Sequence, residues 1–428
     1  MNYDETIEYL YSQLPVFQKV GGSAYKEGLD NSLALDEYFS HPHAKYKTIH
    51  VAGTNGKGST SHILAAILQS AGYKVGLYTS PHLVDFRERI RINGEKISEQ
   101  YVVDFVAEHH IFYESIHPSF FELTMTMAFK YFADTQVDVA IIEVGLGGRL
   151  DSTNIITPDL GIVTNISFDH TQFLGDTLEK IAEEKAGIIK PNIPIIIGEA
   201  EGDVRQVFQN TADRVGAPIR FAEDENIVRS WNVDKGILYI DTSQYANLKN
   251  GLSGYAQLKN TATILCAIDE LKKIGYTISD NALYDGFEHI VELTGLMGRW
   301  QIIQHSPKII CDTGHNVGGV KYIVEQLKNE KYRQLHFILG VVNDKDISGI
   351  LTLLPKDANY YFVKASIPRA LGADELKQKA QVFGLEGDCY PSVDEGAIAA
   401  LKVAGDDDLI FVGGSNFTVG DALMYLCK

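Results

Sequence analysis

The sequence predicts an α/β protein of two domains, each built on a parallel sheet with helices on both faces. Short apolar runs alternate with helical spacing of apolar residues over residues 47–165, as in doubly wound sheets. A similar series begins after residues 293–299, a segment with three turn or kink signals. The length of 428 residues also exceeds one ordinary core. We therefore expect an N-terminal domain over residues 1–295 and a smaller C-terminal domain over residues 296–428.

The N-terminal series contains apolar runs that are typical of strands covered on both faces: residues 48–52, 74–78, 137–144, 160–166 and 193–197. Helical spacing of apolar residues predicts helices over residues 59–71, which Gly72 ends, and over residues 122–133. Residues 203–255 are more polar, with a strand-like piece at 236–240, and a helix over residues 260–274 ends at Gly275.

The C-terminal series predicts a Rossmann-like α/β domain. Its predicted strands are residues 308–311, 336–341, 360–364 and 409–412, and its first helix is residues 317–327.

Composition excludes several classes of protein. The formal charge of −18 argues against a nucleic-acid partner, because binding to a duplex needs a basic face. No run of about 18 apolar residues exists, so no membrane partner is expected. The N-terminus does not have the pattern of a signal peptide, and the four cysteines are far apart in the sequence. These features predict a cytoplasmic protein without disulfides or a zinc site.

The most informative motif is a glycine-rich loop between a strand and a helix. It consists of Gly53, Thr54, Asn55, Gly56, Lys57, Gly58, Ser59 and Thr60. Glycines let backbone N–H groups converge on a phosphate, and a helix N-terminus and a lysine add positive charge. The spacing differs from GxxxxGK[ST], since two residues are missing between Gly53 and Gly56 and Gly58 stands between Lys57 and Ser59. The strand before and the helix after favour a phosphate-binding P-loop over a simple turn with a solvated lysine.

Polar residues follow three predicted strands, at the edge where α/β sheets bind ligands. Ser80, Glu143 and His170 are candidates for a magnesium site, with Asp169 beside His170. A serine after a strand is usually a turn or cap residue, and a lone histidine is usually a packing residue. Glu143 is the hardest to explain that way, because a carboxylate in an apolar strand is costly to bury without a cation or partner.

The segment 145–151 (GLGGRLD) superficially resembles a dinucleotide fingerprint, but the third glycine of GxGxxG would fall at Leu150. A nicotinamide-dependent oxidoreductase is therefore not supported. The segment is equally consistent with a loop that approaches a ligand, with Arg149 or Asp151 as polar contacts, and with a tight turn with solvated charges.

Other polar residues are ambiguous from residue type alone. Lys185 has the pattern of a lysine on a helix surface. Asp312 and His315 follow the strand 308–311, where they could serve a ligand or belong to a helix N-cap with a solvated histidine. Arg299 could hold a phosphate or pair with a surface acid.

Nine segments in order nevertheless resemble one family: GTNGKGST (53–60), TSPHL (79–83), FFELT (120–124), EVGLGGRLDSTN (143–154), SFDHT with LG (167–175), EKAGIIKP (184–191), LKNTATIL (258–265), GRWQ (298–301) and DTGHNVGG (312–319). The chain resembles folylpolyglutamate synthase/dihydrofolate synthase, a branch of the Mur ligase family. DTGHNVGG departs from many members at Thr313, Gly314 and Val317.

The resemblance implies roles for individual residues. Lys57 and its loop would hold the phosphates of ATP, and Ser80, Glu143 and His170 would bind magnesium. Lys185 would be carbamylated and support a second magnesium ion, so that Lys57, His170 and Lys185 are the implied catalytic residues. The implied ATP contacts outside the loop are Asn260, Arg299, Asp312 and His315. The implied contacts to the pterin-bearing substrate are Gly28, Leu29, Asp30, His82, Phe121, Glu122, Leu150, Asp151 and Ser152, with Lys26 at the edge of the first group.

The resemblance also implies a reaction. A carboxylate would attack the γ-phosphate of ATP to give an acyl phosphate and ADP, and the amine of L-glutamate would then displace phosphate. The acceptor would be dihydropteroate, a reduced folate or both, and the enzyme would be a monomer. A cell-wall Mur ligase is the alternative within the same class, although TSPHL and SFFELT favour the folate branch. A nucleotide-binding switch without ligase chemistry is the alternative from another class, and the second α/β domain argues against it.

Overall fold

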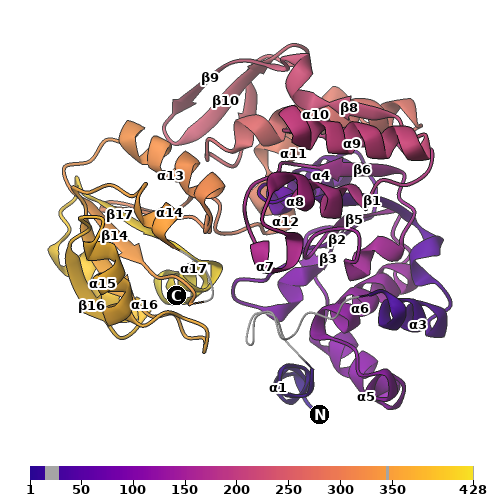
Figure 1. Cartoon of the computed structure of the whole chain (residues 1–428), viewed down its shortest axis with the longest axis horizontal. Coiled ribbons are helices and arrows are strands. Elements are labelled where there is room, and N and C mark those ends of the chain that lie inside the picture. Colours follow the sequence, from indigo (N-terminus) through magenta and orange to yellow (C-terminus); the bar gives the residue numbers. More distant parts are fainter. Residues whose placement is uncertain (15–27, 344–346, 428) are drawn as a thin grey trace. The chain divides into compact units, whose positions relative to one another are not determined.

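The computed structural model describes residues 1–14, 28–343 and 347–427, and it divides into two compact units (Figure 1). The first unit holds the described residues up to Gly251 together with Gln257–Leu296. The second holds Leu252–Ala256 and the residues from Met297 on. Within the second unit, the Tyr255 N–H donates to Gln326 Oε1 at 2.9 Å, and Gln326 Nε2 donates to the Ser253 carbonyl at 2.8 Å.

The first unit is built on an eight-stranded sheet in the order β4-β3-β2-β5-β1-β6-β7-β8. The six strands from β2 to β8 in this order are parallel, while β3 and β4 form an antiparallel edge. The bounds are β1 (Lys47–Ala52), β2 (Val75–Tyr78), β3 (Ile90–Ile92), β4 (Glu95–Lys96), β5 (Val139–Glu143), β6 (Leu160–Val163), β7 (Ile195–Ile197) and β8 (Ile219–Phe221). The predicted doubly wound α/β fold is confirmed for this unit.

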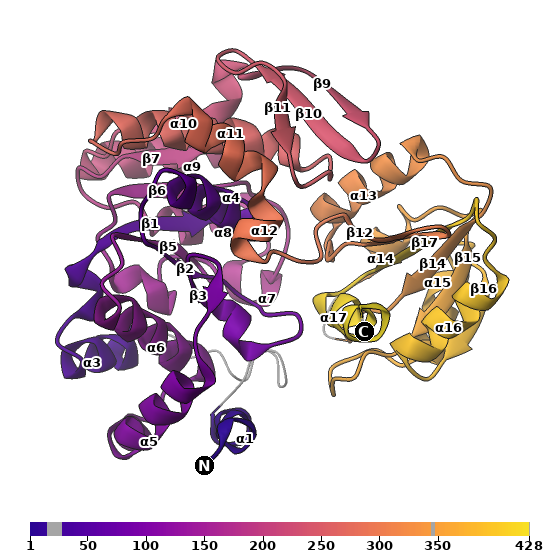
Figure 2. The same ribbon diagram turned by 180° about the vertical axis from the view of Figure 1, so that it is seen from behind.

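Helices cover both faces of this sheet. The α-helices are α1 (Tyr3–Gln13), α3 (Asp30–Tyr38), α4 (Lys57–Ser70), α5 (Glu99–Ile116), α6 (Phe120–Asp134), α7 (Thr171–Leu174), α8 (Leu178–Ala186), α9 (Gly202–Val215), α10 (Gln257–Lys273), α11 (Asp280–Glu288) and α12 (Ile290–Thr294). The 3-10 helices are η2 (Pro42–Lys45), η3 (Phe86–Arg89), η4 (Ser152–Ile155) and η5 (Ala222–Glu225). Figure 2 shows α4, α10 and α11 on one side of the sheet and α3, α5 and α6 on the other.

A small antiparallel sheet completes the first unit. Its order is β11-β10-β9, with β9 (Val228–Asp234), β10 (Ile237–Thr242) and β11 (Leu248–Asn250). The polar stretch 203–255 thus contains the strand expected near 236–240, and two further strands whose mixed polarity gave no clear signal.

The second unit contains a six-stranded sheet in the order β12-β13-β17-β14-β15-β16, parallel except for β12. The strands are β12 (Gln301–His305), β13 (Lys308–Cys311), β14 (Leu335–Leu339), β15 (Asn359–Val363), β16 (Gly387–Tyr390) and β17 (Leu409–Gly413). The helices are α13 (Val317–Asn329), α14 (Ser348–Leu351), α15 (Ala373–Gln381), α16 (Val393–Val403) and α17 (Asn416–Leu426). The predicted second α/β fold is confirmed.

Local chemistry explains where the helices nearest the site begin. Ser119 and Glu122 form a capping box at the start of α6, in which each side chain accepts a backbone N–H of the other residue. Helix α4 differs, because its N-cap is Gly56 in the left-handed region, without a side-chain cap or an acidic residue in its first turn. The N-terminal N–H groups of α4 are therefore left for another acceptor.

Within the part of the chain that the structure describes, no helix combines the length and the apolar character needed to cross a membrane.

The packing of α11 on α4 requires a glycine. A Cβ added at Gly286 would lie 2.5 Å from both the backbone N and the Cα of Ile67, in the last turn of α4. Because backbone atoms cannot move aside without shifting the helix, α4 is held in place by this contact.

We expect Gly286→Ala to lower the free energy of unfolding by about 1–3 kcal/mol, because the added methyl group must push α11 away from α4. Gly372→Ala is the matched control, since a Cβ there meets no atom within 4 Å, and it should stay within about 1 kcal/mol of the wild type. Urea denaturation followed by circular dichroism measures both values. Equal stability of the two variants would contradict the packing argument.

Candidate active site

The carboxyl ends of four parallel strands meet at one edge of the first sheet. Register pairs Tyr78 with Ile142, Val51 with Glu143, and Ala52 with Val163. The loops that follow β2, β5, β1 and β6 therefore start side by side. These loops carry most of the site residues predicted in the first unit.

The glycines of the phosphate loop are required by close contacts. Gly53 has φ +142°, and a Cβ there would lie 1.9 Å from Thr164 Oγ1. Gly56 has φ +85°, and a Cβ there would lie 2.4 Å from Asn260 Oδ1. Asn260, predicted as a nucleotide contact, is thus packed directly against the loop.

The loop is fixed to the segment after β6. The N–H groups of Thr54 and Asn55 donate to the carbonyl and the side-chain oxygen of Asn165, each at 2.9 Å. Thr164 Oγ1 donates to the Asn55 carbonyl at 2.5 Å. These bonds hold the loop in one conformation before any ligand binds.

Groups that can bind a phosphate lie at this loop. Lys57 Nζ donates to the carbonyls of Gly53 at 3.0 Å and Thr54 at 3.3 Å, so the ammonium lies over the loop. Gln257 Nε2 lies 3.3 Å from Ser59 Oγ. Thr60 Oγ1 is buried and has no hydrogen-bond partner among the described residues. A lysine, an uncapped helix N-terminus and buried hydroxyls together suit a phosphate group.

Ser80 and Glu143 are brought together as predicted. The Ser80 N–H donates to Glu143 Oε2 at 3.0 Å. Glu143 is 3% exposed at the end of β5, where a buried carboxylate needs donors or a cation.

His170 lies in the loop after β6 and begins α7. It adopts a left-handed conformation with φ +50°, and its Nε2 is 3.8 Å from Asp169 Oδ1. His170 is thus the N-cap residue of α7 without a side-chain cap hydrogen bond, and its side chain is 29% exposed.

Lys185 is buried, so its interpretation as a helix-surface lysine is wrong. It lies near the end of α8 with 4% exposure, and burial together with the charge of Lys57 lowers its pKa to about 7. Asp169, Asp151 and Glu184 act in the opposite direction. The structure thus places Lys57, Asp169 and Asp151 within electrostatic reach of Lys185.

The loop after β5 is packed too tightly to be a simple surface turn. A Cβ at Gly148 would lie 2.8 Å from the Glu184 carbonyl and 3.1 Å from Lys185 Cα, and one at Gly145 would lie 2.5 Å from Phe121 Cζ. Predicted substrate contact Phe121 is therefore against this loop.

The two charged residues of this loop differ. Asp151 is 5% exposed and accepts the Leu146 N–H at 2.8 Å, so it is not a solvated charge. Arg149 is 55% exposed and pairs with Glu184 at 2.8 Å. Leu150 lies between them, and Ser152 begins η4 directly after Asp151.

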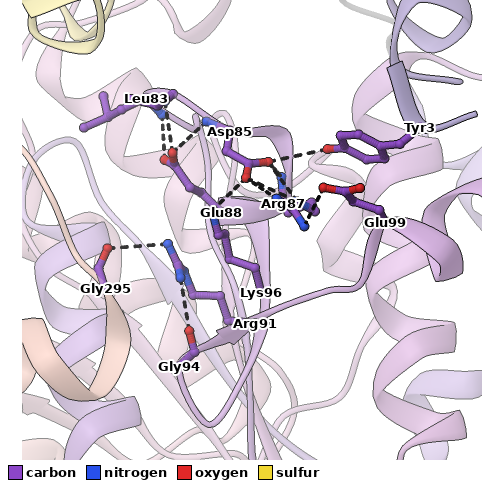
Figure 3. Close-up of polar contacts among 11 residues, drawn as sticks. Tyr3, Leu83, Asp85, Arg87, Glu88, Arg91, Gly94, Lys96, Glu99 and Gly295 are labelled. Atoms are coloured by element: carbon purple, nitrogen blue, oxygen red, sulfur yellow. Dashed lines mark hydrogen bonds and ion pairs between the residues drawn. The ribbon is translucent and has the colours of Figure 1, made fainter. Parts of the chain in front are cut away.

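The loop after β2 is held by a carboxylate that accepts several of the loop's own N–H groups (Figure 3). The Glu88 carboxylate accepts the N–H groups of Leu83, Val84 and Asp85 at 2.8, 3.0 and 2.7 Å. Asp85 in turn pairs with Arg87 at 2.9 Å and with Lys96 at 2.7 Å. Arg87 and Lys96 hold the pKa of Asp85 well below its usual range, although burial acts against them.

His82, predicted to face the substrate, is locked as a neutral ring. Arg89 Nε donates to His82 Nδ1 at 2.8 Å, so the ring proton sits on Nε2, 3.0 Å from the Tyr11 hydroxyl. Burial and the charge of Arg89 lower the pKa of His82 well below its usual value. Tyr11 stacks on Phe120 with ring centroids 5.3 Å apart.

The remaining predicted substrate residues lie at helix starts. Glu122 is 3% exposed and is used by the capping box of α6, where Asn31 Nδ2 also reaches it at 3.4 Å. Leu29 precedes α3 and Asp30 is its first residue, with Gly28 before them. Lys26 lies outside the described residues.

The second unit contains its own polar loop. Asp312 accepts the N–H groups of Trp300 and Gly314, both at 2.7 Å. Burial raises the pKa of Asp312, and the Arg299 guanidinium opposes this rise. His315 Nδ1 lies 2.9 Å from the Thr313 carbonyl, while Asn316 caps α13 by accepting the Gly319 N–H. The N-cap of the helix after this motif is therefore Asn316, and neither Asp312 nor His315 is the capping residue.

Sequence reasoning missed several residues that shape the site. Arg89 and Tyr11 fix His82, and Thr164 and Asn165 fix the phosphate loop. Only Thr164 and Asn165 lay in a predicted strand, and nothing in residue type or spacing connected them to residue 53.

Comparison with known proteins decides the family. The Mur ligase middle domain matches residues 51–268, and the Mur ligase glutamate ligase domain matches residues 298–416. Dihydrofolate synthase/folylpolyglutamate synthase of Escherichia coli K12 is 35% identical over 378 residues, which cover 87% of this chain and 85% of the relative. The chain belongs to the folylpolyglutamate synthase/dihydrofolate synthase branch of the Mur ligase family. It is therefore an ATP-dependent ligase.

Solved structures of this branch share the whole fold. The E. coli FolC complex with DHPP and ADP has a TM-score of 0.85 at 32% identity, covering 99% of this chain and 97% of FolC. A bifunctional folylpolyglutamate synthase/dihydrofolate synthase with Mn, AMPPNP and L-glutamate bound has a TM-score of 0.84 at 28% identity, covering 100% and 98%.

The burial of Lys185 should affect the stability of the folded protein. Lys185→Met should raise the free energy of unfolding by about 1–4 kcal/mol at pH 6, because the ligase then no longer buries an ammonium group. Below pH 7 Lys185 is protonated in both the folded and the unfolded protein, so the folded wild type bears the full free-energy cost of the buried charge. Between about 7 and the unfolded pKa of about 10.4, the folded protein loses its proton first, so wild-type stability rises and the difference shrinks.

Denaturation in buffer purged of carbon dioxide, at pH 6 and pH 9.5, measures this difference. Lys180→Met on the same helix is the control, since its side chain is 58% exposed. A difference that does not change with pH would contradict the assignment of the low pKa to Lys185.

Proposed function

We propose that this ligase joins L-glutamate to the carboxyl group of a pterin-bearing acid, with hydrolysis of ATP to ADP and phosphate. The observation that supports this most strongly is the grouping of Lys57, Lys185 and Asp169 beside a phosphate loop at the sheet edge where Glu143 and Ser80 also lie. The relatives carry the same activity in their names, and two related structures hold ADP with DHPP, and AMPPNP with L-glutamate.

The chemistry explains why cations are gathered there. A carboxylate repels an incoming amine, so it is first converted to an acyl phosphate by attack on the γ-phosphate of ATP, with ADP leaving. The glutamate amine then attacks the acyl carbon, and phosphate leaves as the amide forms. Lys57 and the N–H groups of α4 would stabilise the charge on the transferred phosphoryl group by position and electrostatics.

The donor set fits a hard divalent cation. Glu143 and Ser80 offer oxygen atoms in contact with each other, and His170, in the loop after β6 at the same sheet edge, offers a ring nitrogen. Within the described ranges, no three His, Cys, Asp or Glu side chains are grouped as a metal site. Magnesium retains several waters and uses few protein ligands, so fewer donors suffice for it. Such ions would neutralise phosphate charge when bound.

Two proposals concern the nucleotide and Lys185. We propose that Asn260 and, in the second unit, Arg299, Asp312 and His315 serve the nucleotide. We also propose that Lys185 is carbamylated, because its pKa of about 7 leaves a large neutral fraction at physiological pH and only a neutral amine reacts with carbon dioxide. The product is a carboxylate that could support a second cation.

The acceptor would occupy the loops after β2 and β5. We propose His82, Phe121, Leu150, Asp151 and Ser152 as its contacts, because Phe121 packs on the loop that carries the last three. For Gly28, Leu29, Asp30 and Glu122 the same role is proposed from the resemblance, and Glu122 would act while also capping α6.

We further propose that the enzyme works in the cytoplasm as a monomer. The four cysteines are all free thiols, which fits a reducing compartment.

The reaction is tested by measuring ADP release with dihydropteroate, dihydrofolate or tetrahydrofolate, each with and without L-glutamate. We expect release only when an acid and glutamate are both present, and a loss of at least about a hundredfold in Lys57→Ala. Lys180→Ala is the control. ADP release without any acid or glutamate would indicate a nucleotide-binding switch. ADP release with a nucleotide-linked sugar acid, but with none of the three pterin-bearing acids, would indicate a cell-wall Mur ligase.

Carbamylation is tested by ¹³C NMR in ¹³C-bicarbonate. We expect a carbamate resonance at pH 8 that weakens at pH 6, because the neutral amine disappears as pH falls through about 7. Lys185→Met should lack the resonance, and Lys180→Met should keep it. A spectrum without a resonance specific to Lys185 would exclude the modification.

A further inference from the structure

Three polar side chains connect the interior of the sheet to the loop after β5. His50 lies on β1 with 0% exposure, and its Nε2 is 2.8 Å from Thr153 Oγ1 in η4. Thr153 Oγ1 is 2.5 Å from Asp151 Oδ1. Thr153 is also fully buried, so both bonds are shielded from water.

The direction of these hydrogen bonds is determined by the acceptor at the end. The Asp151 carboxylate accepts the Thr153 N–H at 3.0 Å on Oδ1 and the Leu146 N–H at 2.8 Å on Oδ2, so it acts as an acceptor throughout. The single hydroxyl proton of Thr153 therefore points at Asp151. Its oxygen must accept from His50, which places the ring proton on Nε2.

This arrangement has a cost that packing alone does not explain. His50 Nδ1 is buried without a hydrogen-bond partner among the described residues, where a valine or leucine would pack without such a loss. Burial, with a contribution from Lys190, also lowers the pKa of His50 to about 3, so the ring stays neutral. A neutral ring that must donate from Nε2 is suited to orienting the threonine hydroxyl.

The other end of this series of hydrogen bonds is Asp151, which lies in the loop proposed to contact the acceptor. Asp151 accepts the Leu146 N–H, next to Gly145, where an added Cβ would lie 2.5 Å from Phe121 Cζ. The same loop is pinned on its far side, where the Arg149 N–H donates to the Glu184 carbonyl at 2.7 Å. Rotation of the Asp151 carboxylate would therefore change the loop on which the proposed acceptor contacts stand.

We propose that His50 is a positioning residue which, acting through Thr153, fixes the orientation of Asp151 for the acceptor acid. The inference rests on the proposed function, because it assigns the acceptor to the loop after β5. It assigns His50 no contact with ATP, glutamate or the reacting atoms.

The first test compares Thr153→Val with Thr153→Ser. Valine has nearly the shape of threonine but neither donates to Asp151 nor accepts from His50, while serine retains both bonds. We expect the valine variant to raise the KM for dihydropteroate about tenfold, with kcat and the KM for ATP within about twofold, and the serine variant to resemble the wild type. Thr261→Val is the matched control, since Thr261 is fully buried and its Oγ1 has no partner among the described residues.

The second test uses His50 itself and guards against a Thr153 variant that does not fold. His50→Leu should raise the KM for dihydropteroate about fivefold, and His50→Gln, whose amide can donate in place of Nε2, should restore most of it. In a double-mutant cycle, His50→Leu should have no further effect in the Thr153→Val background, because the path is already broken.

Different results have different meanings. The positioning role of His50 would be overturned by additive effects of His50→Leu and Thr153→Val. It would also be overturned if kcat and the KM for ATP changed as much as the KM for dihydropteroate. Either result would leave the proposed function intact. The same holds if Thr153→Val behaves as Thr261→Val does. A wild-type enzyme that releases no ADP with any of the three acids and glutamate would overturn both proposals.

Discussion

The site depends on an interaction that disfavours a charge, because burial and the nearby ammonium of Lys57 together lower the pKa of Lys185. Lys57 lies over the phosphate loop. A second ammonium group at Lys185 would raise the free energy of the folded enzyme, so Lys185 gives up its proton near pH 7. The neutral amine is the form that the proposed carbamylation requires. Lys57 and the uncapped N-terminus of α4 attract a ligand with several negative charges, which a nucleotide triphosphate has.

The backbone makes this proximity possible through small residues at contact points. Gly53 lies against Thr164, Gly56 against Asn260, and Gly148 against the backbone of Lys185. Each contact joins one loop of the sheet edge to a different element, so the loops support one another. The hydrogen bonds from Thr54 and Asn55 to Asn165 add to this. The site is thus preorganised by packing more than by ion pairs.

Much of the fold could be predicted from the sequence, because long apolar runs such as 137–144 are distinctive and glycines mark the helix ends. The short antiparallel strands β3, β4 and β12 could not, since two to five residues of mixed polarity give no periodic signal. The phosphate loop and the pairing of Ser80 with Glu143 followed from their positions after strands. Lys185 shows the limit of local reasoning, because its burial results from a glycine loop 37 residues earlier that packs on α8. His50 is similar, since only the fold brings it to Thr153.

The short segment Leu252–Ala256 changes how the two units are connected. It belongs to the second unit, where Ser253 and Tyr255 share Gln326, yet the chain returns to the first unit at Gln257 and leaves it again after Leu296. Within the described residues from 28 on, the polypeptide therefore crosses the boundary three times. A fragment that starts at Met297 would lack both partners of Gln326. The remaining fragment, which ends at Leu296, would still carry the segment Leu252–Ala256 of the second unit. Neither half is a contiguous stretch of sequence, so a lineage that exchanged one of them by a single recombination event would damage both.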